Sequence, residues 1–161
     1  MEQTSKTFGS FEDLETYKAA REFRKKMYRV AKTLPESEKF NLCSQIRRAA
    51  LSVTNNIAEG HGRFYDLDNI RFALISRGSV QELMDDLNTC EDEGYLPQLE
   101  VARLKDEATG VLRLINGYVR YLRENKVGAN LGLHEDPIAY QTDDALTWLN
   151  ELDPQSLITN H

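Results

Sequence analysis

Proline, cysteine and long apolar runs are all scarce in this sequence, and each scarcity excludes a class of structure. Four prolines and nine glycines among 161 residues favour long, uninterrupted helices. No apolar stretch reaches the roughly 18 residues that a membrane-spanning helix needs, so we expect no contact with a membrane. The first six residues, MEQTSK, lack the apolar core of a signal peptide, which predicts a cytoplasmic protein.

Residues suited to metal binding or covalent catalysis are equally scarce. The two cysteines, Cys43 and Cys90, lie far apart in apolar helical patterns, which predicts two reduced, buried thiols. None of the three histidines belongs to a Glu-x-x-His pair, the motif that builds di-metal sites in helical bundles. We therefore expect no metal and no cofactor. The segment GHGR at 60–63 lacks the lysine of a phosphate-binding loop, and no other catalytic motif is evident, so the protein is not expected to be an enzyme.

The net charge of −6 hides an uneven distribution along the chain. All 20 Lys and Arg residues lie at or before Lys126, together with 20 of the 26 Asp and Glu residues. The chain up to Lys126 is therefore neutral, and the remaining six acidic residues fall in a segment without any Lys or Arg. The acidic composition of the whole chain consequently says little about whether the first 126 residues bind nucleic acid.

Apolar residues recur every three or four positions through most of the chain, which is the pattern of amphipathic helices. This periodicity predicts an all-α protein without strands. The expected helices cover about residues 11–34, 37–60, 67–93 and 98–124. Because the connections between them are short, we expect an antiparallel up-down-up-down four-helix bundle.

The chain divides into a bundle and two flanking segments. The bundle should occupy residues 11–125, between a flexible N-terminus (1–10) and an acidic C-terminal tail (126–161). Within the tail, residues 142–152 have the apolar spacing of a short helix with two aspartates near its start. The residues expected to make tail contacts with the bundle, a neighbouring subunit or another protein are Trp148, Leu149 and Leu152. A frayed tail that touches the bundle only loosely is the simpler alternative.

The first predicted helix carries a row of positive charge opposite its apolar stripe. The members repeat at steps of three or four residues and so share one face: Lys18, Arg21, Lys25, Arg29 and Lys32. We call this row the basic ridge. Arrayed positive charge suits the phosphates of RNA or DNA, so the basic ridge is the candidate nucleic-acid-binding surface. A face that is merely solvated would show the same pattern and stays open as the alternative.

The second and third predicted helices hold polar residues suited to contacts between helices or subunits. Asn56, Glu59 and Arg63 share one face at the end of the second helix. Glu59 and Glu82 are expected to pair with arginines of other helices or subunits and so to fix the helix alignment. The whole predicted cluster comprises Arg47, Arg48, Asn56, Glu59, Arg63, Arg71, Arg77 and Glu82. A polar binding site at this end of the bundle is the alternative, and a catalytic role is the least expected.

The start of the third predicted helix is apolar nearly all round. A helix of an isolated four-helix bundle has a polar outer side, so apolar residues on both sides predict a second surface packed on another subunit. The residues expected at this oligomer contact are Ile70, Phe72, Leu74 and Ile75.

Several dispersed motifs give the sequence its resemblance to a known family. They are FEDL at 11–14, YKAA at 17–20, SQIRRAA at 44–50, NIAEG at 56–60 and RGSVQEL at 77–83. In these motifs the chain resembles the four-helix bundle proteins encoded by intervening sequences of 23S ribosomal RNA genes, a family similar to the accessory variability proteins of diversity-generating retroelements. The resemblance covers about residues 11–125, and one departure is Thr54, where the family often has proline.

The resemblance implies an antiparallel four-helix bundle and, as in characterised relatives, a ring-shaped homopentamer. For the retroelement relatives it implies binding of nucleic acid and a reverse transcriptase through a basic surface, whereas for most members it implies no established activity. The resulting prediction is a bacterial, non-enzymatic adaptor that binds RNA, DNA or a nucleic-acid enzyme through the basic ridge. The alternative is a protein-binding scaffold whose acidic tail captures a protein partner.

Overall fold

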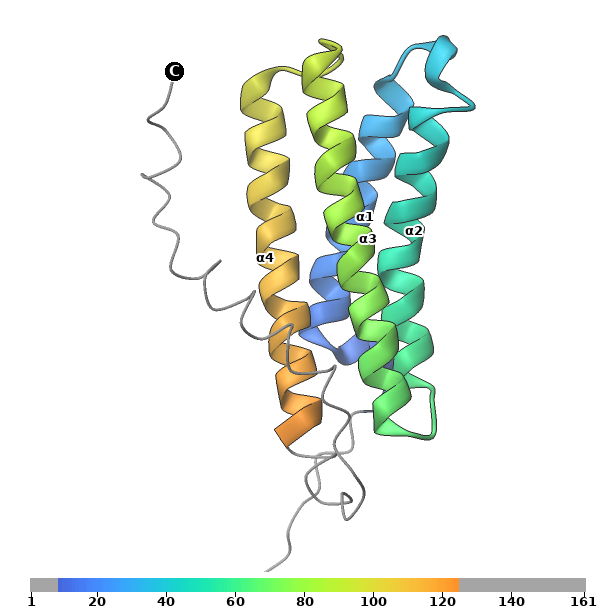
Figure 1. Cartoon of the computed structure of the whole chain (residues 1–161), viewed down its shortest axis with the longest axis vertical. Helices are drawn as coiled ribbons and strands as arrows, with labels where there is room; N and C mark the ends of the chain where they lie inside the picture. Colours follow the sequence, from blue (N-terminus) through green and yellow to red (C-terminus); the bar gives the residue numbers. More distant parts are fainter. Residues whose placement is uncertain (1–8, 125–161) are drawn as a thin grey trace, which may run out of the picture. The chain divides into compact units, whose positions relative to one another are not determined.

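Four α-helices make up most of the described part of the chain. The computed structural model describes residues 9–124 of the 161. The helices are α1 (Glu15–Thr33), α2 (Leu42–His61), α3 (Asp66–Asp92) and α4 (Gln98–Leu122), shown in Figure 1. Residues 9–124 contain no strand, which confirms the all-α prediction for this range. The predicted tail and its helix at 142–152 lie outside the described residues.

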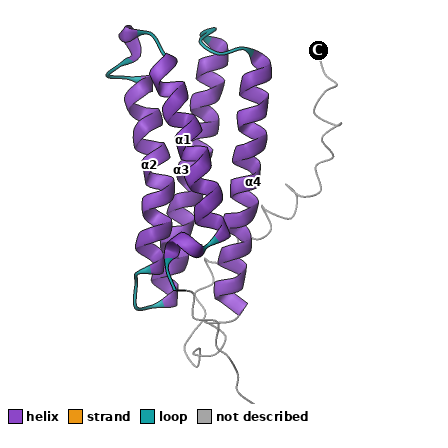
Figure 2. Cartoon of the chain, turned by 180° about the vertical axis from the view of Figure 1, so that it is seen from behind, coloured by secondary structure: helices purple, strands orange, loops and turns teal. Residues whose placement is uncertain are grey.

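The four helices lie side by side around one apolar core. α2 packs between α1 and α3, and α4 packs on α3 and on α1, which closes the bundle. Figures 1 and 2 show the α1–α2 and α3–α4 connections at one end of the bundle and the α2–α3 connection at the other. Every helix contributes side chains that are at most 1% exposed, among them Phe23, Met27, Ile57, Leu83 and Ile115. Burial of such side chains is the main force that holds the bundle together.

The first predicted helix is divided into two pieces. A 3-10 turn, Phe11–Asp13, precedes α1, and Leu14 between them has an extended backbone. Ser10 starts the turn with a reciprocal cap, in which its hydroxyl accepts from the Glu12 N–H and its own N–H donates to Asp13. The prediction of one continuous helix from residue 11 was therefore wrong. The Ser10 cap belongs to the short 3-10 turn, and the extended backbone of Leu14 separates this turn from α1.

The second predicted helix begins later than the periodicity indicated. A second 3-10 turn, Glu36–Glu38, precedes α2, which starts only at Leu42. The Glu38 carboxylate accepts from the Leu42 N–H at 3.3 Å and so occupies a donor that a helix leaves unpaired at its start. The prediction of a start near residue 37 was therefore wrong by about one turn of helix.

The break between α3 and α4 lies where the sequence predicted it. Gly94 has a φ of 70°, the left-handed region that favours glycine. The Tyr95 N–H donates to the Cys90 carbonyl at 2.8 Å and closes the end of α3. Pro97 then precedes α4. None of the described helices is long and apolar enough to cross a membrane.

Candidate functional site

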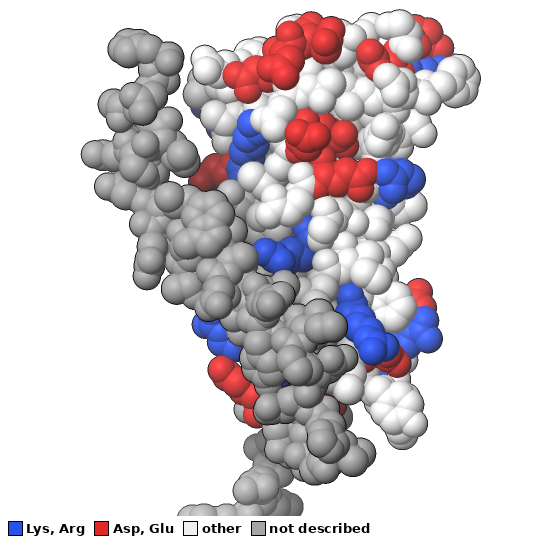
Figure 3. All heavy atoms as spheres, viewed as in Figure 1, with Lys and Arg blue, Asp and Glu red and all other residues white. Residues whose placement is uncertain are grey.

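Charge is separated across the bundle. α1 carries seven Lys and Arg residues against two Glu, and α3 carries seven Asp and Glu residues against two Arg. Because α1 and α3 each pack mainly on α2 and α4, they occupy opposite corners of the bundle. Figure 3 views the protein from the α3 side and shows Asp and Glu side chains gathered over the upper part of that face. The chain up to Lys126 has no net charge, yet its bundle has one basic edge, at α1, and one acidic edge, at α3.

All five members of the basic ridge are exposed on α1. Two of them are paired within the helix, since Lys18 lies 2.8 Å from Glu15 and Lys25 lies 2.6 Å from Glu22. The bond to Glu15 raises the pKa of Lys18, and the bond from Lys25 lowers the pKa of Glu22. The other three members form no ion pair with any described residue: Arg21, Arg29 and Lys32. The charges of Arg21 and Arg29 act on nearby Glu22 without an ion pair and, after the Lys25 bond, help to lower its pKa.

The predicted polar cluster is spread over several places. Arg48 of α2 pairs with Glu82 of α3, as a contact between helices requires. Glu59 pairs with Arg63, one turn further along its own chain segment, and not with an arginine of another helix. Arg71 lies 3.6 Å from Asp68, also within one helix. Among the eight residues of the predicted cluster, Arg48 and Glu82 are the pair that joins two helices within residues 9–124.

The remaining three members of the predicted cluster have separate surroundings. Asn56 donates to the Ser52 carbonyl at 2.8 Å and to the Ser52 hydroxyl at 2.9 Å, so it is satisfied within α2. Arg77 is half-buried, and its Nε has no acceptor among the described residues. Arg47 is exposed and forms no ion pair in the described part of the chain. The eight residues therefore do not converge on one binding or catalytic site.

The residues predicted at the oligomer contact divide into two groups. Ile70 is only 7% exposed and packs in the core of the protomer, so its assignment to an outer surface was wrong. Phe72 is half-buried, with the Arg63 guanidinium 4.8 Å from its ring centroid. Leu74 and Ile75 are 39% and 51% exposed, as an apolar outer surface requires.

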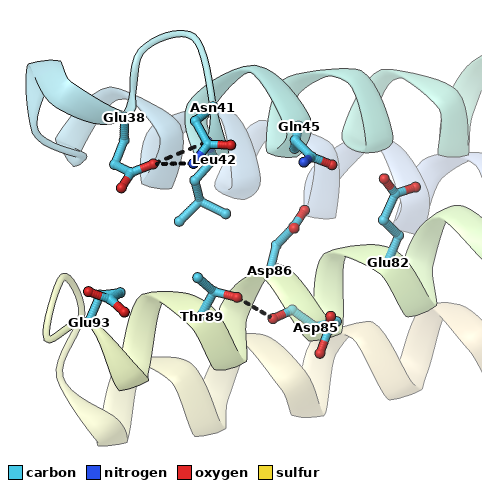
Figure 4. A pocket seen from close by; sticks show the side chains of 9 residues that line it. All are labelled: Glu38, Asn41, Leu42, Gln45, Glu82, Asp85, Asp86, Thr89 and Glu93. Carbon is cyan, nitrogen blue, oxygen red and sulfur yellow. Dashed lines mark hydrogen bonds between the residues drawn. The ribbon is translucent and has the colours of Figure 1, made fainter.

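An acidic pocket that the sequence did not reveal lies between α2 and α3. It has a volume of about 510 Å³ and holds five carboxyl groups, from Glu38, Glu82, Asp85, Asp86 and Glu93. Figure 4 shows them on the two walls of the pocket, with Asp86 directed towards α2. Burial, and then the neighbouring Glu82 and Asp85 charges, raises the pKa of Asp86 to about 6.

Contacts around the pocket are chiefly structural. Glu38 accepts from the Tyr95 hydroxyl at 2.9 Å and ties the α1–α2 connection to the α3–α4 connection. Asp86 Oδ2 is buried and has no hydrogen-bond partner among the described residues. No group of three or more His, Cys, Asp or Glu side chains within residues 9–124 is arranged to hold a metal ion. The predicted tail contacts, Trp148, Leu149 and Leu152, lie outside the described range.

Comparison with known proteins assigns the chain to a family. The sequence pattern of the 23S rRNA-intervening sequence proteins matches residues 12–117. The chain belongs to this family. The matched range includes all of α1, α2 and α3 and most of α4, so the basic ridge and the acidic pocket both lie inside the family domain.

A solved structure shares the fold. It is the crystal structure of a protein of unknown function from the S23 ribosomal protein family of Bacteroides thetaiotaomicron, with a TM-score of 0.61 and 20% sequence identity. The match covers 65% of this chain and 95% of that one. No curated protein matches the sequence. Family membership and fold are thus established, and the function has to be argued from the surface of the bundle.

Proposed function

We propose that this member of the family is a non-enzymatic adaptor that binds nucleic acid, or a nucleic-acid enzyme such as a reverse transcriptase, through the basic ridge. The supporting observation is the run of exposed cations along α1, of which Arg21, Arg29 and Lys32 have no carboxylate partner among the described residues. Phosphate binding needs arrayed positive charge more than groups that read bases. The acidic edge at α3 would face away from such a ligand.

A charge reversal within the ridge tests this proposal. Replacing both Lys25 and Arg29 by Glu is expected to weaken binding of a mixed RNA and DNA oligonucleotide pool by roughly tenfold or more at moderate salt. The matched control is Arg113→Glu with Arg120→Glu, which makes the same charge change at exposed positions of α4. Fluorescence anisotropy gives the affinities, and circular dichroism shows whether both variants remain helical.

Two results would contradict the proposal. Binding by the Lys25→Glu, Arg29→Glu variant that equals binding by the parent would show that the ridge does not hold the ligand. A loss of oligomer mass in this variant, with none in the control, would instead show that α1 contacts the acidic α3 edge of a neighbouring copy. Because one protomer carries a basic α1 and an acidic α3 at opposite corners, a contact between copies is the main alternative to nucleic-acid binding by α1.

We also propose that the chain is an antiparallel bundle that assembles as a homo-oligomeric ring, expected to be a pentamer. Exposed apolar side chains on α3, Leu74 and Ile75, support an interface there. The variant Leu74→Glu with Ile75→Glu is expected to reduce the solution mass to that of a single chain, because charges do not pack in an apolar interface.

Light scattering measures this mass directly. Leu99→Glu is the matched control, since Leu99 is 65% exposed on α4, away from the proposed interface. A parent protein that is already a single chain would contradict the ring proposal, as would a Leu74→Glu, Ile75→Glu variant with the mass of the parent.

A further inference from the structure

One half-buried arginine of α1 points away from the basic ridge and towards α2. Arg24 Nη1 donates to the Thr54 hydroxyl at 2.8 Å, and this hydroxyl in turn donates to the Leu51 carbonyl at 3.2 Å. Arg24 forms no ion pair with any described carboxylate. Since a guanidinium has five N–H donors in a fixed plane, a single bond to a hydroxyl leaves most of its donors available.

A second unpaired arginine lies on the neighbouring helix. Arg47 precedes Thr54 by seven residues, or about two helical turns, so both lie on the side of α2 that faces α1. Arg47 is exposed and has no ion-pair partner in the described part of the chain. Arg24 and Arg47 therefore place two more positive charges beside the ridge, along the junction of α1 and α2.

The carboxylates of these two helices are already occupied. α1 and α2 together contain three acidic residues, and each is paired with a cation close by in its own segment: Glu15 with Lys18, Glu22 with Lys25 and Glu59 with Arg63. No carboxylate of α1 or α2 remains to neutralise Arg24 or Arg47. The positive face thus extends from the ridge across α1 to α2.

The two tyrosines of α1, Tyr17 and Tyr28, are half-buried, and α2 contains no Phe, Tyr or Trp. The described aromatics that are clearly exposed are Phe40, Phe64, Tyr65 and Tyr121; none belongs to α1 or α2, although Phe40 lies in the connection between these two helices. Proteins that bind single strands commonly stack bases on exposed aromatic rings. A helical surface with exposed cations and only half-buried rings is better suited to the phosphates on the outside of a duplex.

We infer that α1 and α2 form one face that binds the phosphates of double-stranded nucleic acid, with Arg24 and Arg47 as a second row beside the basic ridge. Thr54 is a positioning residue, because its hydroxyl holds the Arg24 guanidinium at the α1–α2 junction. This inference rests on the proposed function and adds to it the class of ligand and three residues outside the ridge.

The test compares the affinity of the full chain for a short fluorescent duplex and for one of its strands over a range of salt concentrations. The parent is expected to bind the duplex more tightly. Replacing Arg24 and Arg47 by Gln should reduce the dependence of log affinity on log salt by about two units, since each phosphate contact contributes about 0.9. Arg103→Gln with Arg113→Gln, at exposed positions of α4, is the matched control and should leave the dependence unchanged.

Thr54 variants separate positioning from stability. Thr54→Val removes the acceptor for Arg24 and should weaken duplex binding, whereas Thr54→Ser keeps the hydroxyl and should retain it. Melting temperatures of both variants show whether the fold is intact. A loss of binding in Thr54→Val that Thr54→Ser does not rescue would contradict the positioning role.

The outcomes distinguish this inference from the proposed function. If Lys25→Glu with Arg29→Glu abolishes binding while the Arg24→Gln, Arg47→Gln variant matches the parent, the ridge binds nucleic acid and the second row is wrong. Tighter binding of the single strand than of the duplex would overturn the assignment to a duplex. If the parent binds neither ligand at low salt, the proposed function fails and the inference fails with it.

Discussion

Replacing Gly60 by alanine is expected to destabilise the protein by about 2–3 kcal/mol, the cost of forcing an extra carbon into a packed contact. Gly60 of α2 lies at a close approach to α3. A Cβ atom at this position would lie 2.9 Å from Asn69 Oδ1, 2.9 Å from Phe72 Cβ and 3.1 Å from the Asn69 carbonyl oxygen. Two of these neighbours are fixed to the backbone of α3, so the helices would have to move apart.

Separation of the helices at Gly60 would also disturb the contact behind it. Asn69 donates to the Tyr118 hydroxyl at 2.9 Å and so joins α3 to α4. The control is Gly78→Ala, because a Cβ there has no neighbour within 4 Å. This control should stabilise the protein by about 0.5–1 kcal/mol, as alanine is the better residue inside a helix.

Chemical denaturation of both variants measures the difference. Equal stability of the Gly60→Ala variant and the parent would show that the α2–α3 contact is looser than the structure indicates. Similar losses in both variants would show that the effect is not specific to the close approach at Gly60.

Replacing Asp86 by asparagine is expected to stabilise the protein at pH 7 by about 2 kcal/mol. This value is less than the free energy that corresponds to the whole pKa shift, because solvent screens the charge of a half-buried group. Burial is the main cause of the pKa of about 6 at Asp86, and the charges of Glu82 and Asp85 add to it. Above this pKa the carboxylate is charged in a place that disfavours charge. Asparagine has nearly the same shape and removes that cost.

The same residue makes stability depend on pH in a definite direction. The pKa of Asp86 is about 6 in the folded protein against an ordinary value of 3.8, so between these values the folded state binds the proton more tightly. The contribution of Asp86 to the free energy of unfolding is therefore greatest below a pH of about 4 and is lost as the pH rises to about 6. In the Asp86→Asn variant this component should be absent.

Denaturation curves of the parent and the variant over this pH range test the expectation. Asp106→Asn, which removes one charge at an exposed position of α4, is the control for net charge. An Asp86→Asn variant that is less stable than the parent at pH 7 would show that the carboxylate makes a favourable contact there. Parallel pH profiles would show that Asp86 does not titrate in this range.

The helices were largely readable from the sequence because each one carries a continuous apolar stripe. The starts of α1 and α2 could not be predicted in this way. The 3-10 turns Phe11–Asp13 and Glu36–Glu38 continue the apolar periodicity of the helices that follow them without belonging to those helices. Their boundaries depend on particular hydrogen bonds, those of Ser10 and Glu38. Spacing alone does not determine such bonds.

The basic ridge was readable for the same reason as the helices: its residues share one helix, so their spacing fixes their common face. Features that join two helices were harder to predict. The Arg48–Glu82 pair was one of several pairings that the sequence allowed, whereas no pattern in the sequence predicts the Arg24–Thr54 bond or the burial of Asp86. Ile70 was misplaced because an apolar helix start does not reveal which of its sides faces the protomer core.

The most direct test of the account is the salt dependence of nucleic-acid binding by the full chain. If the α1 face holds several phosphates, affinity for a short duplex should fall by roughly tenfold or more between about 50 and 200 mM salt, because each contact releases counterions. The same fall should be seen with duplexes of unrelated sequence. Absence of binding at the lowest salt, or an affinity that does not change with salt, would contradict the claim that α1 binds phosphates.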